Sequence, residues 1–375
     1  MKRLFLFILF IAALYFTKPY WEESVSQYVD ISFLEPVDEK IDTLLTKESL
    51  DTTIRSISNT IDKAISYLTS MTAETEDSIP IAEKPVLDKP VKTQVSVHNI
   101  ELGSPQEKVA AELGEPKSNS MNEYGTEWFT YHDGYQNFVM VSFDEKQTVN
   151  AIYTNDDLIS STTGIKYGSL KSTVRETFGE PIKEIRKGLN IYMLQESEGF
   201  DVFKSGDTYT YVFYDLHQND KVTAIQLIND SLEKKKTGIY AGGDAKLRNG
   251  FELQLFDLTN AARVRHGLSI LKWESNVAGT ARKHSADMAD NDYFSHENKQ
   301  GKSPFDRMKD DGVSFRGAGE NLAYGQSSSI FAHEGLMNSE GHRENILLDT
   351  YSHLGTGVSF NEKLQPYYTE NFLLK

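Results

Sequence analysis

Four short stretches near the C-terminal end concentrate side chains that could do chemistry. They are HSADMADNDYFSHEN (284–298), GAGENLAYG (317–325), NSEGHRENIL (338–347) and YSHLGTGVSF (351–360). Neutral imidazoles are the commonest nitrogen ligands of zinc, and a nearby carboxylate can hold a water molecule or orient a ring. A buried glutamate beside a histidine also shifts the pKa of both groups, which suits general acid–base catalysis. The stretches therefore indicate a polar pocket that could either bind a metal ion or transfer protons.

The sequence carries no self-sufficient catalytic motif. His333-Glu334 is followed by Gly335-Leu336-Met337, so no H-E-x-x-H zinc motif is formed, and no G-x-S-x-G elbow occurs. The complete lack of cysteine excludes disulfides, thiolate catalysis and a lipoprotein cysteine. Two histidines alone make an incomplete metal shell, so a bound metal would need water or another side chain.

The charge balance limits the possible partners. The chain has 375 residues and a net charge of −16, of which residues 241–375 contribute only −3. Nucleic acids require a basic surface, so we expect no nucleic-acid partner. The same balance disfavours docking on anionic lipid head groups.

The first residues have the layout of an export signal. A basic pair precedes thirteen apolar residues over 4–16, which suit a signal-peptide core and fall short of the roughly 17–20 that span a bilayer. No A-x-A cleavage site follows, and Tyr20 and Trp21 suit a membrane interface. We therefore favour an uncleaved membrane anchor over 1–21, with a secreted protein as the alternative. Either outcome places the body of the chain outside the cytoplasm.

A predicted helical stalk and a predicted linker follow. Residues 24–70 form the predicted helical stalk, on which one apolar stripe is made by Ile54, Ile57, Ile61, Ile65 and Leu68. This stripe is either a self-association seam or a face packed on its own chain. Residues 71–96 are rich in proline and acidic residues and predict an extended linker.

An internal repeat defines the next region. LGSPQEKVAAELGEP (102–116) recurs as YGSLKSTVRETFGEP (167–181). Each copy predicts a helix with a serine N-cap, Ser104 or Ser169, and a glycine stop, followed by alternating strands. We expect two small α+β units, each a helix on an antiparallel sheet, packed as one domain over 97–237.

The four chemical stretches lie among helices and a strand. A first helix is expected from Phe251 to a stop at Gly267, and a second begins at an Asn276 cap. PYYTENF (366–372) predicts a closing strand. The expected fold class is therefore α+β.

The C-terminal region over 241–375 resembles the CAP superfamily of cysteine-rich secretory, antigen 5 and pathogenesis-related 1 proteins, in a cysteine-free bacterial form. The resemblance rests on the ordered strings H-S-x-D-M, Y-F-S-H, S-P-F-D-R-M, G-E-N-L-A, N-S-x-G-H-R-x-N-I-L and S-H-x-G-x-G-V. It implies a three-layer α-β-α sandwich with a central cleft. The region over 97–237 resembles the domain that commonly precedes bacterial CAP domains.

The resemblance also implies a set of cleft residues. Many members line the cleft with two histidines and two glutamates, and some bind a divalent metal through the histidines. His296 matches the first histidine, Glu320 the first glutamate and His353 the second histidine. Ser339 stands where the second glutamate is expected, with Glu340 one residue away. The implied metal ligands, for Zn²⁺ or another divalent ion, are His296 and His353.

The remaining polar residues of these strings have plainer interpretations. His342 either lines the cleft or caps the following helix, and we expect His284 to be a packed structural histidine. His333 is expected at the surface. Asp306 and Arg307 in SPFDRM predict a structural ion pair or a helix cap.

Two functions follow from these residues. The first is a non-enzymatic module outside the cytoplasm whose cleft binds a lipid, a peptide or a cell-wall fragment. The second is a metal-dependent hydrolase or protease in which Glu320 is the catalytic residue. Ser339 at the second glutamate position favours the first.

Overall fold

The computed structural model describes residues 81–187, 190–194, 197–236 and 238–375. The predicted anchor (1–21), the predicted stalk (24–70) and the first part of the predicted linker lie outside these residues. Among the described helices, none combines the length and apolar character that crossing a bilayer requires.

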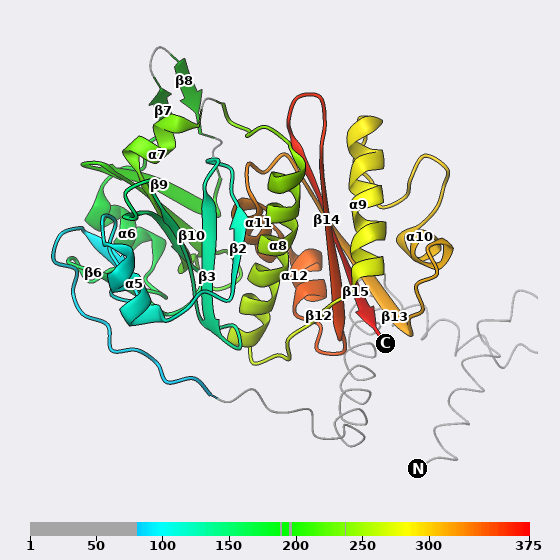
Figure 1. Ribbon diagram of the computed structural model, residues 1–375, viewed down its shortest axis with the longest axis horizontal. Coiled ribbons are helices and arrows are strands. Elements are labelled where there is room, and N and C mark those ends of the chain that lie inside the picture. The colour runs from blue at the N-terminus through cyan, green and yellow to red at the C-terminus, as the bar shows by residue number, and fades with distance from the viewer. Residues whose placement is uncertain (1–80, 188–189, 195–196, 237) are drawn as a thin grey trace, which may run out of the picture. The chain divides into compact units, whose positions relative to one another are not determined.

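The repeat region folds around one seven-stranded antiparallel sheet with the order β2-β3-β4-β5-β11-β10-β9. Its strands are β2 (Ser118–Met121), β3 (Glu127–Asp133), β4 (Gln136–Phe143), β5 (Val149–Thr154), β9 (Phe200–Ser205), β10 (Thr208–Asp215) and β11 (Lys221–Asn229). The last strand of each repeat pairs with the other at the centre, where Ile152 lies opposite Leu227. The two expected units therefore share a single continuous sheet (Figure 1).

Each repeat begins with a short helix, α5 (Gln106–Leu113) or α6 (Lys171–Phe178). Gly114 and Gly179 end these helices with positive φ, as predicted. The predicted serine caps are wrong, because the N-cap residues are Pro105 and Leu170. The hydroxyl of Ser104 instead accepts the Glu101 N–H and closes the preceding turn.

Smaller elements flank the large sheet. They are the pair β1 (Val95–Val97) with β6 (Ile159–Ser161), the hairpin β7 (Glu184–Lys187) with β8 (Asn190–Met193), and α7 (Asp230–Lys235). The described part of the predicted linker is extended but held on this half. The Glu101 carboxylate accepts the backbone N–H groups of Lys92 and Thr93 at 2.7 and 2.6 Å.

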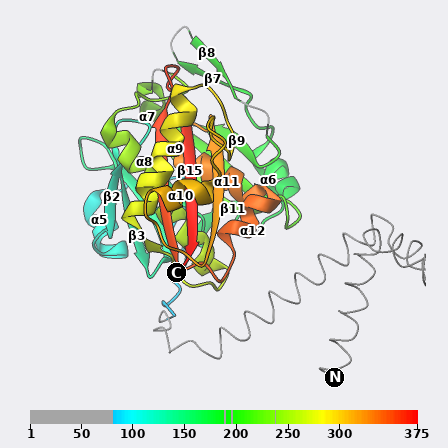
Figure 2. The ribbon, with the colours of Figure 1, turned by 90° about the vertical axis from the view of Figure 1, so that its right-hand side faces the viewer.

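The C-terminal half has three layers around a four-stranded sheet with the order β12-β14-β15-β13. The strands are β12 (Lys272–Trp273), β13 (Gly317–Tyr324), β14 (His353–Phe360) and β15 (Pro366–Leu374), and the helices are α8 (Ala245–Arg265), α9 (Ser275–Asp290), α10 (Pro304–Asp310), α11 (Ser329–Asn338) and α12 (Glu340–Ile346). Helices α9 and α10 cover one face, and α8, α11 and α12 pack on the other (Figure 2). The arrangement agrees with the sandwich that the resemblance implies.

Glycines on β14 explain the close packing of α9. A Cβ atom on Gly355 would lie 2.2 Å from the Ala278 nitrogen, and one on Gly357 would lie 2.0 Å from the Arg282 nitrogen. Thr356, between them, points to the opposite face and donates to the Glu252 carbonyl of α8. The strand alternation thus fixes which helix lies on which face.

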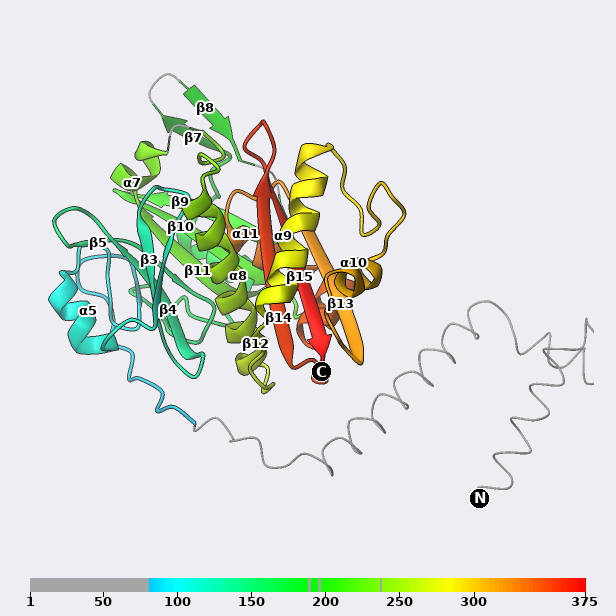
Figure 3. The ribbon, with the colours of Figure 1, turned by 45° about the vertical axis from the view of Figure 1, so that its right-hand side comes forward.

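Helix α8 lies between the two sheets and belongs to both cores (Figure 3). Leu258 and Ala261 pack with Trp128 and Tyr153 of the large sheet, whereas Leu255 packs with the C-terminal sheet. Its N-terminus lies earlier than predicted, because Asp244 caps it by accepting the Leu247 N–H. Its C-terminal stop at Gly267 has φ of 75°, as expected for such a position.

Candidate functional site

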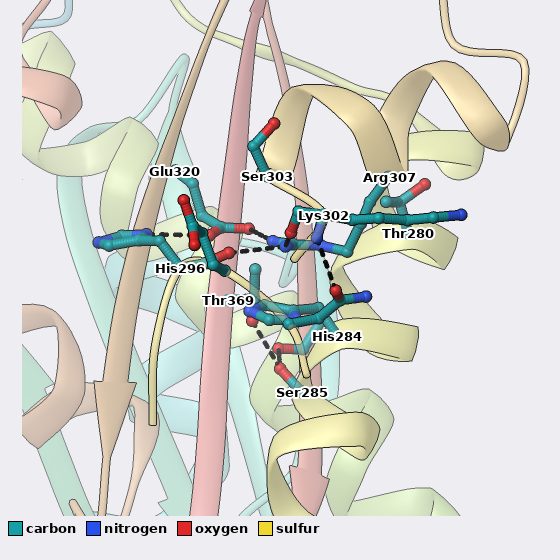
Figure 4. A network of polar contacts seen from close by, with 12 residues as sticks. Thr280, His284, Ser285, His296, Lys302, Ser303, Arg307, Glu320 and Thr369 are labelled. Atoms are coloured by element: carbon teal, nitrogen blue, oxygen red, sulfur yellow. Dashed lines mark hydrogen bonds and ion pairs between the residues drawn. The ribbon is translucent and has the colours of Figure 1, made fainter. Parts of the chain in front are cut away.

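Glu320 is a buried carboxylate on β13 with both oxygens bound. Its side chain is 1% exposed. His296 Nδ1 lies 2.9 Å from Oε1, and Arg307 Nη2 donates to Oε2 at 2.6 Å (Figure 4). Because Arg307 occupies Oε2, we assign the remaining contact to a proton on His296 Nδ1 donated to Oε1, which leaves Nε2 for solvent or a ligand. The His296 side chain is 53% exposed and is therefore accessible.

Helix α10 positions Arg307. Ser303 and Asp306 form a capping box at its start, and Pro304 occupies the first turn. Arg307 then reaches Glu320 while its Nη1 donates to the carbonyl of His296 at 2.6 Å. One guanidinium therefore fixes both the carboxylate and the backbone of the histidine beside it.

His284 supports the same loop from α9. It is 1% exposed, and its Nε2 lies 3.0 Å from the carbonyl of Ser295, the residue before His296 (Figure 4). Burial lowers the pKa of His284, so the neutral ring with a proton on Nε2 fits this contact. The geometry is that of the packed structural histidine that we expected.

The junction of α11 and α12 brings a second histidine to the site. The Ser339 hydroxyl lies 2.8 Å from His342 Nδ1, and Asn321, next to Glu320, donates to the His342 carbonyl. Burial lowers the pKa of His342, and the charge of His296 lowers it further. His296, Glu320, Ser339 and His342 thus lie together, and we call this group the polar site.

Comparison with known proteins confirms the family resemblance noted in the sequence. A family model described as "CAP-associated N-terminal" matches residues 102–238, and one described as "Cysteine-rich secretory protein family" matches residues 256–372. A Bacillus subtilis protein named "Uncharacterized membrane protein YlbC" is 31% identical over 292 residues, which cover 72% of this chain and 82% of that protein. The chain belongs to the cysteine-rich secretory protein family. Below, 241–375 is called the CAP domain and 97–237 the CAP-associated domain.

A further relative and two solved structures are also similar to this chain. The Bacillus subtilis protein YkwD is 42% identical over 109 residues, which cover 29% of this chain and 42% of that protein. The crystal structure of an extracellular SCP-domain protein from Bacillus anthracis superposes with a TM-score of 0.64 at 28% identity, covering 79% of this chain and all of that one. A Staphylococcus aureus cysteine-rich secretory protein, at 16% identity, gives a TM-score of 0.61 over 77% of this chain and 95% of its own, and supports the fold alone.

The structure places His353 away from the other residues assigned to the cleft. It begins β14 opposite Leu373, whereas Glu320 lies opposite Asn371 on the far side of β15. Strands two apart lie about 10 Å apart and two residues of register add about 7 Å, so the Cα atoms are roughly 12 Å apart. His353 Nδ1 instead contacts the Ser352 hydroxyl at 2.9 Å. Burial, followed by the charge of Lys375, lowers its pKa.

The residues do not fit the implied metal pair. His296 and His353 do not converge, and Glu320 has both oxygens bound by neighbouring side chains. Within the described part of the chain, no three His, Cys, Asp or Glu side chains are grouped to hold a metal ion. No chemical step through a metal is therefore derived.

The surface prediction for His333 is wrong. Its side chain is 1% exposed, because this face of α11 packs toward the large sheet of the CAP-associated domain. Burial lowers the pKa of His333 to about 3. The residues three or four positions from His333 include the apolar Ile330, Leu336 and Met337, so the helical pattern was a usable signal that this face is covered.

Arg307 is a residue of the candidate site that the sequence did not identify. Asp306 and Arg307 were predicted to form an ion pair or a helix cap. The cap is confirmed for Asp306, which forms the capping box with Ser303, whereas Arg307 binds Glu320. The capping-box spacing from Ser303 to Asp306 was a usable signal. The Asp306 carboxylate is bound by the Ser303 N–H in such a box, so Arg307 is left to bind another partner.

Proposed function

We propose that this CAP protein binds a polar ligand outside the cytoplasm and that the polar site is where it binds. The state of Glu320 carries this proposal. Both of its oxygens are bound within the protein, so the carboxylate orients His296 and is not available as a free base. Because the His296 side chain is half-exposed, its Nε2 is then a fixed hydrogen-bonding group for a ligand. This arrangement favours recognition over hydrolysis.

The location outside the cytoplasm is part of the proposal. The relative YlbC is named a membrane protein, and the Bacillus anthracis structure is described as an extracellular protein. The basic and apolar layout of residues 1–21 agrees with both names if this segment anchors the chain. The ligand would then be a component of the cell envelope.

Among envelope components, the charge favours a cell-wall fragment. The net charge of −16, of which residues 241–375 contribute −3, disfavours anionic lipid head groups, whereas glycan and short peptide groups present hydroxyls and amides. The His342 imidazole, whose pKa is lowered by burial, and the Ser339 hydroxyl suit those groups as hydrogen-bond partners. We therefore take peptidoglycan fragments as the ligand class.

Co-sedimentation with purified peptidoglycan sacculi tests this. We expect the wild-type protein and the control His353→Ala to sediment alike, and His296→Ala to lose about tenfold in affinity through one lost hydrogen bond. Vesicles containing phosphatidylglycerol form the second arm, in which binding through residues 1–21 should be indifferent to His296→Ala. Equal binding of sacculi by His296→Ala and wild type would overturn the proposal. If the wild-type protein released soluble fragments from the sacculi and Glu320→Gln did not, the protein would be a hydrolase and not a binding module.

A further inference from the structure

A pocket of about 510 Å³ lies between the CAP-associated domain and the CAP domain. Phe200, Tyr211 and Phe213 line it from the large sheet, and Phe331 and Gly335 line it from α11. Its volume falls in the range of pockets that bury a small organic molecule. Ser339 is the only member of the polar site among the described residues that line it.

A cluster of aromatic rings forms part of the wall of this interdomain pocket. The centroid of the Phe331 ring lies 5.2 Å from that of the Phe200 ring and 5.3 Å from that of the Phe213 ring, and both contacts are edge-on. At the rim, Met193 is 67% and Ile239 is 50% exposed, although both side chains are apolar. Apolar side chains left open around an aromatic cavity are typical of a surface that a ligand covers.

One end of the pocket holds two lysine side chains beside a single carboxylate. Lys187 Nζ lies 2.7 Å and Lys236 Nζ 4.0 Å from the same oxygen of Glu233, so two ammonium groups share one carboxylate. All three side chains are at most 12% exposed. Burial raises the pKa of the nearby Glu123 to about 7, so that carboxyl does not add a full negative charge at neutral pH. The Glu334 carboxyl on the opposite wall is raised to a pKa of about 7 by the same cause.

We propose that the interdomain pocket is a second binding site, for a small amphiphile with an aromatic or apolar body and one anionic group. The body would occupy the aromatic walls, and the anionic group would lie near Lys187 and Lys236. This site goes beyond the proposed function, because it requires neither His296 nor Glu320. It also assigns a role to the CAP-associated domain, which supplies most of the walls and both lysines.

Two fluorescent probes of matched shape test this proposal. 1-Anilinonaphthalene-8-sulfonate carries one anionic group, and N-phenyl-1-naphthylamine has the same rings without it. Gly335→Leu should fill the pocket, because a Cβ atom there meets nothing within 4 Å. Gly279→Leu is the control, since it also adds a side chain at an open helical glycine but lies on α9, outside the pocket. Both changes replace glycine by a better helix former, so the fold should persist, as thermal melting would verify.

We expect both probes to bind wild type and Gly279→Leu with one saturable site, and Gly335→Leu to lose that site. Lys236→Met should weaken the sulfonate probe about fivefold and leave the neutral probe unchanged, since only the charged group loses a partner. Saturable binding that survives in Gly335→Leu would show that the probes bind elsewhere and would overturn the site. If Lys236→Met weakened the binding of both probes equally, the proposal that the ligand carries an anionic group would be overturned.

Discussion

At the scale of single residues, the ion pair of Glu320 with Arg307 determines what the polar site can do. The pair is nearly dry, with side chains 1% and 9% exposed. A buried charge that loses its partner costs far more than a surface pair, because the remaining charge has no water to replace the contact. Arg307 therefore stabilises the fold and holds the Glu320 carboxylate in place at once.

Glu320→Gln removes the charge and keeps the shape. We expect it to lower the free energy of unfolding by about 3 kcal/mol, because the Arg307 guanidinium stays buried without its counter-ion. Urea unfolding at pH 7 measures this. Asp310→Asn, which breaks the exposed pair with Lys302, is the matched control and should leave the stability essentially unchanged. Similar losses in the two variants would contradict the buried-pair interpretation.

The structure brings together most, but not all, of the residues that were predicted to line the cleft. His296, Glu320, Ser339 and His342 come together, whereas His353 does not. The second histidine could not be chosen from the strings alone, because G-H-R and Y-S-H occur within eleven residues of each other. Only the strand register, which leaves His353 two strands from β13, separates them.

At the scale of elements, helix stops were predicted better than helix starts. Glycines with positive φ end α5, α6 and α8 at the expected places, because few other residues adopt that conformation easily. The starts differ because serine also closes tight turns, as Ser104 does one residue before the actual cap. The joining of both repeats into one sheet was not predictable, since strand alternation does not say which edges pair.

Helix α11 carries an unusual acid at the contact of the two domains. Glu334 is 6% exposed and accepts the Tyr153 hydroxyl at 2.6 Å. Burial raises its pKa from 4.5 to about 7, so the folded protein holds this proton where the unfolded chain has lost it. The stabilisation from this group is therefore complete below about pH 4.5 and is lost as the pH rises through 7.

Glu334→Gln should remove this pH dependence. Between pH 5 and pH 8 the wild-type unfolding free energy should fall, relative to the variant, by on the order of 3 kcal/mol. Unfolding both proteins in urea at the two pH values cancels the contributions of all other groups. Glu340→Gln, at an exposed position of α12, serves as the control. A difference between wild type and Glu334→Gln that is the same at pH 5 and pH 8 would refute the assignment.

At the scale of the whole molecule, the two domains share part of their cores. Leu258, Ala261 and Ile330 of the CAP domain pack with Trp128 and Tyr153 of the CAP-associated domain. The CAP domain also keeps clusters of its own on both faces of its sheet. Whether residues 241–375 fold without residues 97–237 is therefore a prediction that needs an experiment.

We expect residues 241–375 expressed alone to unfold in one cooperative transition. Its midpoint should lie about 10 °C or more below that of the full chain, because the apolar side chains facing the large sheet lose their cover. Differential scanning calorimetry of both proteins measures this. An aggregated fragment, or one without a transition, would mean that the two regions fold only together.

The attachment of the chain to the membrane rests on residues 1–21, outside the described residues. We expect the mature protein to keep its original N-terminus and to remain with the membrane fraction, its bulk outside, because the basic pair before the apolar run favours the inner side. Mass spectrometry of the mature N-terminus decides between the alternatives. A new terminus between Ala13 and Tyr28 would show cleavage and a released protein.

The proposed polar site can be tested most directly by nuclear magnetic resonance of the histidine rings during titration with soluble peptidoglycan fragments. Labelling the imidazole nitrogens of the purified protein reports on each ring separately. We expect the signals of His296 and His342 to move together with one binding midpoint, while that of His353 stays in place, because only the first two belong to the polar site. Rings that all remain unmoved at saturating fragment, or a His353 signal that moves with the same midpoint as His296, would contradict this assignment.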